Sequence, residues 1–266
     1  MMNAMSFSPQ LVGEGDVDSF LYTNEAVFVE PKVDGIRAIV AKRGDDIKIY
    51  TRGGKDWTDR YKSIVGGLRN EIIAKNAIID GEIAVIKNKV ITYSSIAMKG
   101  KLCANEKLVY FPFDLLHIEG YDIFNDPLLH RKQNLKLILS PEKIIQPIPF
   151  MCTNTRWDID NFYKKCLENK MEGIVLKNSG AYKPGSKYNW LKMKPLRTVD
   201  LKVFDRKPKK DGQGWIYALE GEGLQVKATS KLDLQSKTMV EVKYDRRFPT
   251  SLRFPQILRI REDKYP

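Results

Sequence analysis

The sequence predicts an α+β fold in which a large domain of antiparallel sheets precedes a smaller, nearly all-β domain. Short β-branched and aromatic runs recur along residues 26–194, and three stretches with helical periodicity separate them. Beyond residue 197 the strand-like runs continue, punctuated by glycines, with almost no helical pattern. The chain has 266 residues, 42% of them hydrophobic, which is enough for two modest hydrophobic cores.

Residues 26–51 are predicted to form three strands of one local antiparallel sheet. Apolar runs at 26–29 and 36–40 flank a charged segment, and a turn at 43–46 leads into the third strand. We therefore expect Lys32 on a loop at the mouth of this sheet. Residues 1–25 are expected to form a loose arm with a short helix at most, because Gly13 and Gly15 interrupt any periodicity.

The rest of the large domain alternates helices with strands. Apolar spacing predicts helices at 61–75, at 127–139, where a proline opens the helix, and around 159–167. Strand composition predicts β-strands at 78–86, 108–116, 173–177 and 188–194. We place the domain boundary near Arg197, giving domains at 1–197 and 198–266. The second is predicted to contain short strands and one short helical stretch at 232–235, which is about the size of a five-stranded OB-fold barrel.

Charge and cysteine usage limit the compartment and the class of partner. The net charge of +12 and the isoelectric point near 9.4 favour a polyanionic partner, and they do not separate DNA from RNA. Membrane binding is disfavoured because no basic amphipathic helix or apolar span is evident. Cys103, Cys152 and Cys166 are odd in number and widely spaced, so we expect neither disulfides nor zinc, and a reducing, cytoplasmic location in a bacterium or phage-infected cell.

The segment around Lys32 combines a lysine, an acid, a glycine and an arginine between two apolar runs. A lysine is a covalent nucleophile only when neutral, and a neighbouring cation such as Arg37 favours that form. Asp34 shares a strand face with Lys32 and could orient its amine, while Gly35 permits a tight backbone. Taken alone, the pattern is equally consistent with a solvated surface loop.

The pattern Lys32-x-Asp34-Gly35-x-Arg37 resembles the active-site motif of the covalent nucleotidyltransferases, which comprise ATP-dependent DNA ligases, RNA ligases and mRNA capping guanylyltransferases. The resemblance implies an ATP-grasp-like nucleotidyltransferase domain of antiparallel sheets followed by an OB-fold domain. It also implies that Lys32 carries the nucleotide as a phosphoramidate.

Further segments follow in the order of that family's motifs: 51–54, 80–82, 113–114, 172–177, 190–195 and 253–264. The resemblance implies that Arg52 contacts a strand-end phosphate, that Glu82 holds ribose or a divalent ion, and that Phe113 stacks on adenine. Each segment alone has an ordinary structural explanation, such as a glycine turn or a core phenylalanine. Lys192 and Lys194 alternate onto one strand face, which suits a triphosphate and would also suit a charged sheet edge.

The resemblance implies a minimal, phage-like ATP-dependent DNA ligase that acts as a monomer on nicked duplex DNA with ATP and Mg²⁺. The alternatives are an RNA ligase, a guanylyltransferase that uses GTP, or a basic OB-containing protein that only binds nucleic acid. An NAD-dependent ligase is disfavoured because the chain lacks a cysteine-rich zinc module and an obvious additional cofactor domain. We expect catalysis from Lys32, Asp34, Arg37, Lys192 and Lys194, nucleotide contacts from Glu30, Arg37, Arg52, Glu82, Phe113, Lys177, Lys192, Lys194, Arg261 and Lys264, and a divalent ion at Glu82 and Glu172.

Overall fold

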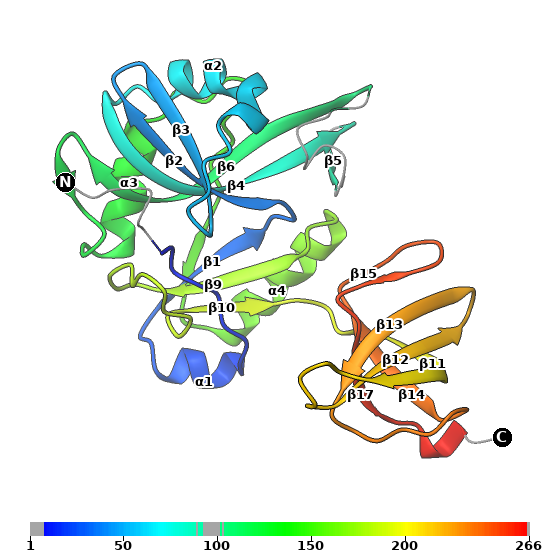
Figure 1. The fold of residues 1–266 in the computed structure, drawn as a ribbon. Coiled ribbons are helices and arrows are strands. Elements are labelled where there is room, and N and C mark those ends of the chain that lie inside the picture. Colours follow the sequence, from blue (N-terminus) through cyan, green and yellow to red (C-terminus); the bar gives the residue numbers. More distant parts are fainter. Residues whose placement is uncertain (1–7, 89, 93–101, 103, 265–266) are drawn as a thin grey trace. The chain divides into compact units, whose positions relative to one another are not determined.

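The computed structural model describes residues 8–88, 90–92, 102 and 104–264, and Cys103 lies outside them. The chain divides into two compact units, Met1–Lys194 and Pro195–Pro266 (Figure 1). Together they form an α+β fold, as predicted. In the part of the chain that the structure describes, each helix is too short or too polar to cross a membrane.

The first unit contains two antiparallel sheets. A six-stranded sheet has the order β3-β2-β4-β6-β7, with β5 paired to β4. Its strands are β2 (Ile36–Arg43), β3 (Asp46–Thr51), β4 (Asn76–Lys87), β5 (Val90–Thr92), β6 (Glu106–Ile118) and β7 (Tyr121–Asp122). A four-stranded sheet has the order β10-β9-β1-β8, formed by β1 (Val27–Lys32), β8 (Met151–Thr153), β9 (Gly173–Asn178) and β10 (Trp190–Met193).

Helices cover these sheets where the apolar spacing predicts them. Helix α2 (Lys62–Glu71), which follows the 3₁₀ turn η2 (Asp59–Tyr61), buries Ile64 and Leu68 in the core of the six-stranded sheet. Helix α3 (Leu128–Leu137) packs on β6, and α4 (Arg156–Glu168) packs on β1 and β9 beside the short α1 (Val17–Tyr22) (Figure 1). The three predicted helices are therefore confirmed.

The prediction that the first three strands share one sheet is wrong. Strands β2 and β3 pair with each other, whereas β1 belongs to the other sheet and pairs with β8 and β9. The reason is packing: Val27 and Val29 join the core beneath α4, and β2 lies in the six-stranded sheet. Gly35 makes the crossing possible, because a Cβ there would come within 2.4 Å of the Ile83 carbonyl oxygen. Lys32 is consequently the last residue of a strand, at the junction of two sheets.

The second unit is a curled five-stranded antiparallel sheet. Its order is β13-β12-β11-β14-β17, and the two edge strands β13 and β17 contact each other. The strands are β11 (Arg197–Pro208), β12 (Trp215–Gly221), β13 (Leu224–Ser230), β14 (Met239–Tyr244) and β17 (Gln256–Ile260), with the small ladder β15 (Arg246–Arg247) and β16 (Leu252–Arg253) and the 3₁₀ turn η4 (Glu262–Lys264). A separate hydrophobic core containing Leu201, Tyr217 and Val240 fills it.

The short helix predicted at 232–235 is absent, because this described segment has no helical hydrogen bonds. Instead the Tyr217 hydroxyl donates to the Leu232 carbonyl oxygen at 2.5 Å and accepts from the Leu234 amide at 3.0 Å. One buried side chain thus satisfies a backbone carbonyl and a backbone amide that lie outside any helix or strand.

Candidate active site

A small pocket lies in the first unit where the two sheets meet. Its wall contains predicted site residues from both sheets, namely Lys32, Arg37, Glu82, Phe113 and Lys177, together with Trp190. Its volume is about 80 Å³, which is below the roughly 300–1,000 Å³ of ordinary ligand pockets. Any larger molecule that binds here must therefore displace side chains.

Lys32 stands at the end of β1 with its amine held by a carboxylate. Its Nζ lies 2.5 Å from Glu172 Oε2, and Lys194 Nζ pairs with the other oxygen of the same carboxylate. Gly173, opposite Lys32 on β9, allows this approach because a Cβ there would lie 2.2 Å from the Met193 carbonyl oxygen. The carboxylate thus holds the amine of Lys32 in place at the end of the strand.

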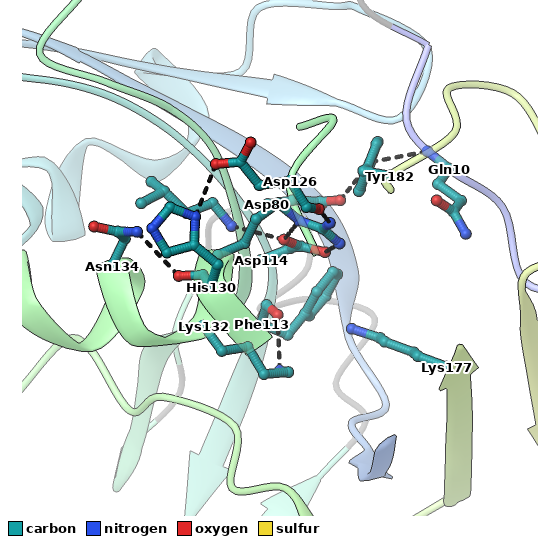
Figure 2. A network of polar contacts seen from close by, with 12 residues as sticks. Gln10, Asp80, Phe113, Asp114, Asp126, His130, Lys132, Asn134, Lys177 and Tyr182 are labelled. Carbon is teal, nitrogen blue, oxygen red and sulfur yellow. Dashed lines mark hydrogen bonds and ion pairs between the residues drawn. The ribbon is translucent and has the colours of Figure 1, made fainter. Parts of the chain in front are cut away.

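Arg37 is anchored by a buried carboxylate and does not stand free beside Lys32. Its Nε donates to Asp80 Oδ1 at 2.5 Å, and its Nη2 contacts the other oxygen of Asp80. Tyr182 donates its hydroxyl proton to Asp80 at 2.6 Å and accepts a hydrogen bond from the backbone N–H of Gln10 at 2.8 Å (Figure 2). Burial opposes the charge on Arg37, but Asp80 outweighs it and raises the pKa of the guanidinium above its usual value.

Two aromatic rings form the base of the pocket, and cations cover their faces. The rings of Phe113 and Trp190 meet edge to face, with centroids 5.9 Å apart. The Lys177 ammonium lies 4.2 Å from the Phe113 centroid and 4.1 Å from the Trp190 centroid, and Arg37 lies 4.7 Å from the Phe113 centroid. The structure thus places Lys177 on the aromatic end of the pocket, deeply buried.

Behind the rings, three buried charged groups form a cluster. Glu30 Oε1 lies 2.5 Å from Lys132 Nζ, and Glu30 Oε2 lies 2.8 Å from Lys177 Nζ. Burial lowers the pKa of Lys177 to about 8; the repulsion from Lys132 acts in the same direction, and Glu30 and Asp114 oppose it. Glu30 therefore acts at this site by binding the ammonium groups of Lys132 and Lys177.

The two predicted metal ligands lie close enough to influence each other electrostatically. Burial raises the pKa of the half-buried Glu82 to about 7, with Glu172 and Asp80 adding to the rise and Lys32 and Arg37 opposing it. Among the described residues no group of three acidic, histidine or cysteine side chains could hold a metal. An ion held by Glu82 and Glu172 alone would need most of its oxygens from another source, such as phosphate or water.

Several predicted residues are not among those that line this pocket, including Glu172 and Lys194, which are described above, and Asp34. Lys192 pairs with Glu14 at 2.8 Å, so its ammonium binds a different carboxylate from that of Lys194. Arg52 is exposed in the turn after β3. In the second unit, Arg261 and Lys264 both bind Asp200, at 2.8 and 2.7 Å.

Asp34 is buried, and Lys32 pairs with Glu172, so the orienting role of Asp34 stays a prediction. Sequence reasoning missed three contributors: Tyr182, which binds Asp80, Lys132, which binds Glu30, and Val12, which lines the pocket. Val12 comes from the arm for which no chemistry was expected. A lysine at a position that apolar spacing assigns to the buried face of a helix, as at Lys132, was the available signal.

The two antiparallel sheets, the lysine at their junction and the following β unit define the class: a nucleotidyltransferase domain with a C-terminal β domain. The family described as "ATP dependent DNA ligase domain" matches residues 12–194. The chain therefore belongs to the ATP-dependent DNA ligase family.

Individual proteins agree with this assignment. DNA ligase 2 of Methanosarcina mazei is 27% identical over 311 residues, covering 94% of this chain and 54% of that protein. The ligase domain of Mycobacterium tuberculosis LigD superimposes with a TM-score of 0.64 at 17% identity, covering 99% of this chain and 97% of that one. A Lig E DNA ligase structure superimposes with a TM-score of 0.66 at 18% identity, covering 98% of this chain and 100% of that one. The chain spans about half or less of the length of the curated relatives it matches.

Proposed function

We propose that this protein is an ATP-dependent DNA ligase that seals 5′-phosphate/3′-hydroxyl nicks in duplex DNA, with Lys32 as the covalent nucleophile. The observation that carries the proposal is the position of the Lys32 amine. It sits at the rim of a pocket with aromatic rings at one end and is held 2.5 Å from Glu172, which also binds Lys194.

In the first step the Lys32 amine, once it has lost its proton, attacks the α-phosphorus of ATP. A nitrogen–phosphorus bond forms, the bond to the bridging oxygen breaks, and pyrophosphate leaves with that oxygen. Glu172 must release Lys32 before the attack, because the amine that is paired with this carboxylate has to turn towards the phosphorus. Lys194, freed from the same carboxylate, and Lys192 would then stabilise the charge that develops on the phosphates.

Mg²⁺ fits Glu82 and Glu172, and when bound it would supply charge stabilisation at the phosphate oxygens. Glu172, which binds both Lys32 and Lys194, would then hold the ion in place of one of these ammonium groups. Phe113 and Trp190 would receive the base, and Arg261 and Lys264 of the second unit would contact pyrophosphate.

In the second and third steps AMP passes from Lys32 to the 5′-phosphate of a nick, and the adjacent 3′-hydroxyl displaces AMP to form the phosphodiester bond. Arg52, exposed in its turn, would contact the 5′-phosphate strand. The net charge of +12 suits a polyanionic duplex. We expect the protein to act as a monomer.

The test is incubation of the protein, first freed of bound AMP with pyrophosphate, with α-labelled ATP and Mg²⁺, followed by nicked DNA. We expect a labelled protein that loses its label on nicked DNA and seals it. Lys32→Ala should capture no label, whereas Lys48→Ala, which alters an exposed ion pair with Asp56, should label normally.

The alternative outcomes are separable in the same assay. Labelling by GTP and not ATP would indicate a guanylyltransferase, and sealing of an RNA nick alone would indicate an RNA ligase. Label retained by Lys32→Ala would exclude Lys32 as the nucleophile. Absence of label from an AMP-free wild-type protein with either nucleotide would leave nucleic-acid binding as the function.

A further inference from the structure

Helix α3 directs two neighbouring cations into the interior beside the pocket. Arg131 forms a buried ion pair with Asp114, with contacts of 2.7 and 3.0 Å, and this pair fixes the helix against β6. The next residue, Lys132, donates to the Phe113 carbonyl oxygen at 3.1 Å (Figure 2). Lys132 also pairs with Glu30 at 2.5 Å. Lys132 therefore connects α3 to β6 and to β1, the strand that ends in Lys32.

The cluster that Lys132 completes has an excess of positive charge. Two lysines share the single carboxylate of Glu30, and all three side chains are only 2–3% exposed. Removing charges from water is costly, and a Glu30–Lys177 pair alone would already balance. The buried ammonium of Lys132 is therefore not needed to neutralise Glu30. Its contacts indicate another role, because it binds both the Glu30 carboxylate and the backbone carbonyl of Phe113.

Lys132 acts on the pocket through its neighbours. Glu30, Phe113 and Lys177 line the pocket, and Lys132 is not among the described residues that do. The charged groups that face Lys177 are Glu30 from β1, Lys132 from α3, Asp114 from β6 and Arg37 from β2, which shares the aromatic rings. Of these, Lys132 is a cation that shares the counter-ion of Lys177.

We propose that Lys132 is a positioning residue for the nucleobase end of the pocket, holding Glu30 and the Phe113 backbone so that Lys177 stays against the two rings. The inference rests on the proposed function, because it takes the aromatic end as the place of the base. It predicts that Lys132 affects recognition of the base and leaves recognition of the phosphates alone.

Two independent effects should follow from removal of the Lys132 charge. Affinity for ATP should fall about 10- to 100-fold, the loss expected for a buried charge-assisted hydrogen bond, while affinity for inorganic tripolyphosphate stays unchanged. The pKa of Lys177, about 8 in the intact cluster, should rise, because repulsion is removed and Glu30 becomes available to Lys177 alone.

The experiment compares Lys132→Met, Lys132→Gln and Lys132→Arg with Lys136→Met, an exposed position on the same helix. Calorimetry in EDTA, where no transfer proceeds, measures binding of ATP and of tripolyphosphate. Nuclear magnetic resonance of ¹³Cε-labelled lysine, assigned with Lys177→Arg, follows the titration of Lys177. We expect Lys132→Arg to retain most ATP affinity, and Lys136→Met to behave as wild type.

Two results would overturn the inference: unchanged ATP affinity in folded Lys132→Met and Lys132→Gln, or equal losses for ATP and tripolyphosphate. If Lys132→Met does not fold, the inference is tested with Lys132→Gln alone, because glutamine keeps a donor for the Phe113 carbonyl oxygen. A wild-type protein that binds no ATP would instead contradict the proposed function, so the two failures are distinguishable.

Discussion

The aspartates that bind arginines in the two units differ in how deeply they are buried. In the first unit, Asp80 and Asp114 are fully buried, each gripping an arginine with two contacts. In the second unit, Asp200 binds Arg261 and Lys264 in a partly exposed cluster, where the Asp200 and Arg261 side chains are 17% exposed and that of Lys264 is 49% exposed. Both arrangements give each cation a carboxylate partner, but the free-energy cost of replacing that carboxylate differs.

The difference in burial decides whether an ion pair keeps its geometry or can exchange its partner. A buried pair is costly to break, because the remaining charge stays out of water without a partner, so it holds pocket walls in one arrangement. An exposed pair contributes little and can exchange its carboxylate for another anion, such as a phosphate, at small cost. We therefore expect the first unit to be preorganised around its pocket and the second to present cations that change partners.

The largest effect should come from the buried pair behind the pocket. Asp80→Asn leaves Arg37 without its counter-ion and should lower the free energy of unfolding by about 3–5 kcal/mol. Urea unfolding followed by ¹⁹F resonances of 5-fluorotryptophan reports the first unit through Trp57, Trp157 and Trp190. Asp56→Asn, in an exposed pair with Lys48, is the matched control and should cost under about 1 kcal/mol. Equal costs for both variants would contradict the comparison.

A second test uses pH in the first unit. The pKa of Glu82 is about 7 in the folded protein, against about 4.3 for a free glutamate. Between these values the folded state binds more protons, so stability should fall as pH rises from about 4.3 to 7, by about 1–3 kcal/mol. Unfolding midpoints measured in EDTA at several pH values should show this slope, and Glu82→Gln should lessen it. A variant with the wild-type slope would show that another group is responsible.

A smaller effect is expected from the partly exposed cluster of the second unit. Asp200→Asn removes the shared carboxylate of Arg261 and Lys264, yet should change the free energy of unfolding by less than about 1 kcal/mol. The fluorotryptophan resonance of Trp215 reports this unit. A loss as large as that of Asp80→Asn would mean that the second unit is also fixed by its charges.

The smallest effect on stability should come from Arg52, which is exposed. Arg52→Ala should change the free energy of unfolding by less than about 0.5 kcal/mol. If Arg52 contacts a phosphate as proposed, binding of nicked duplex should weaken and the salt dependence of log K should decrease by about one. Fluorescence anisotropy across a salt series measures both quantities, and an unchanged slope would exclude the contact.

The sequence by itself determined the α+β class, most of the strands and the three main helices, because these depend on local spacing. The 78–86 run became β4, and the 159–167 spacing became α4. It also predicts which residues carry chemistry, since the segment around Lys32 and the later segments are patterns within a few residues, and those roles stay predictions. Local periodicity is visible in any short window of sequence.

Only the tertiary structure decided which sheet each strand joins and which charges meet. The partners of β1 come from residues 151–178, so a local reading placed β1 beside β2. Glu172 lies 140 residues from Lys32, and Tyr182 lies 102 residues from Asp80. Such pairs depend on which distant segments the fold brings together and on the free-energy cost of leaving a buried charge unpaired. No local sequence pattern indicates either of these. The buried lysine of α3 belongs to the same group, because its function depends on contacts from two other strands.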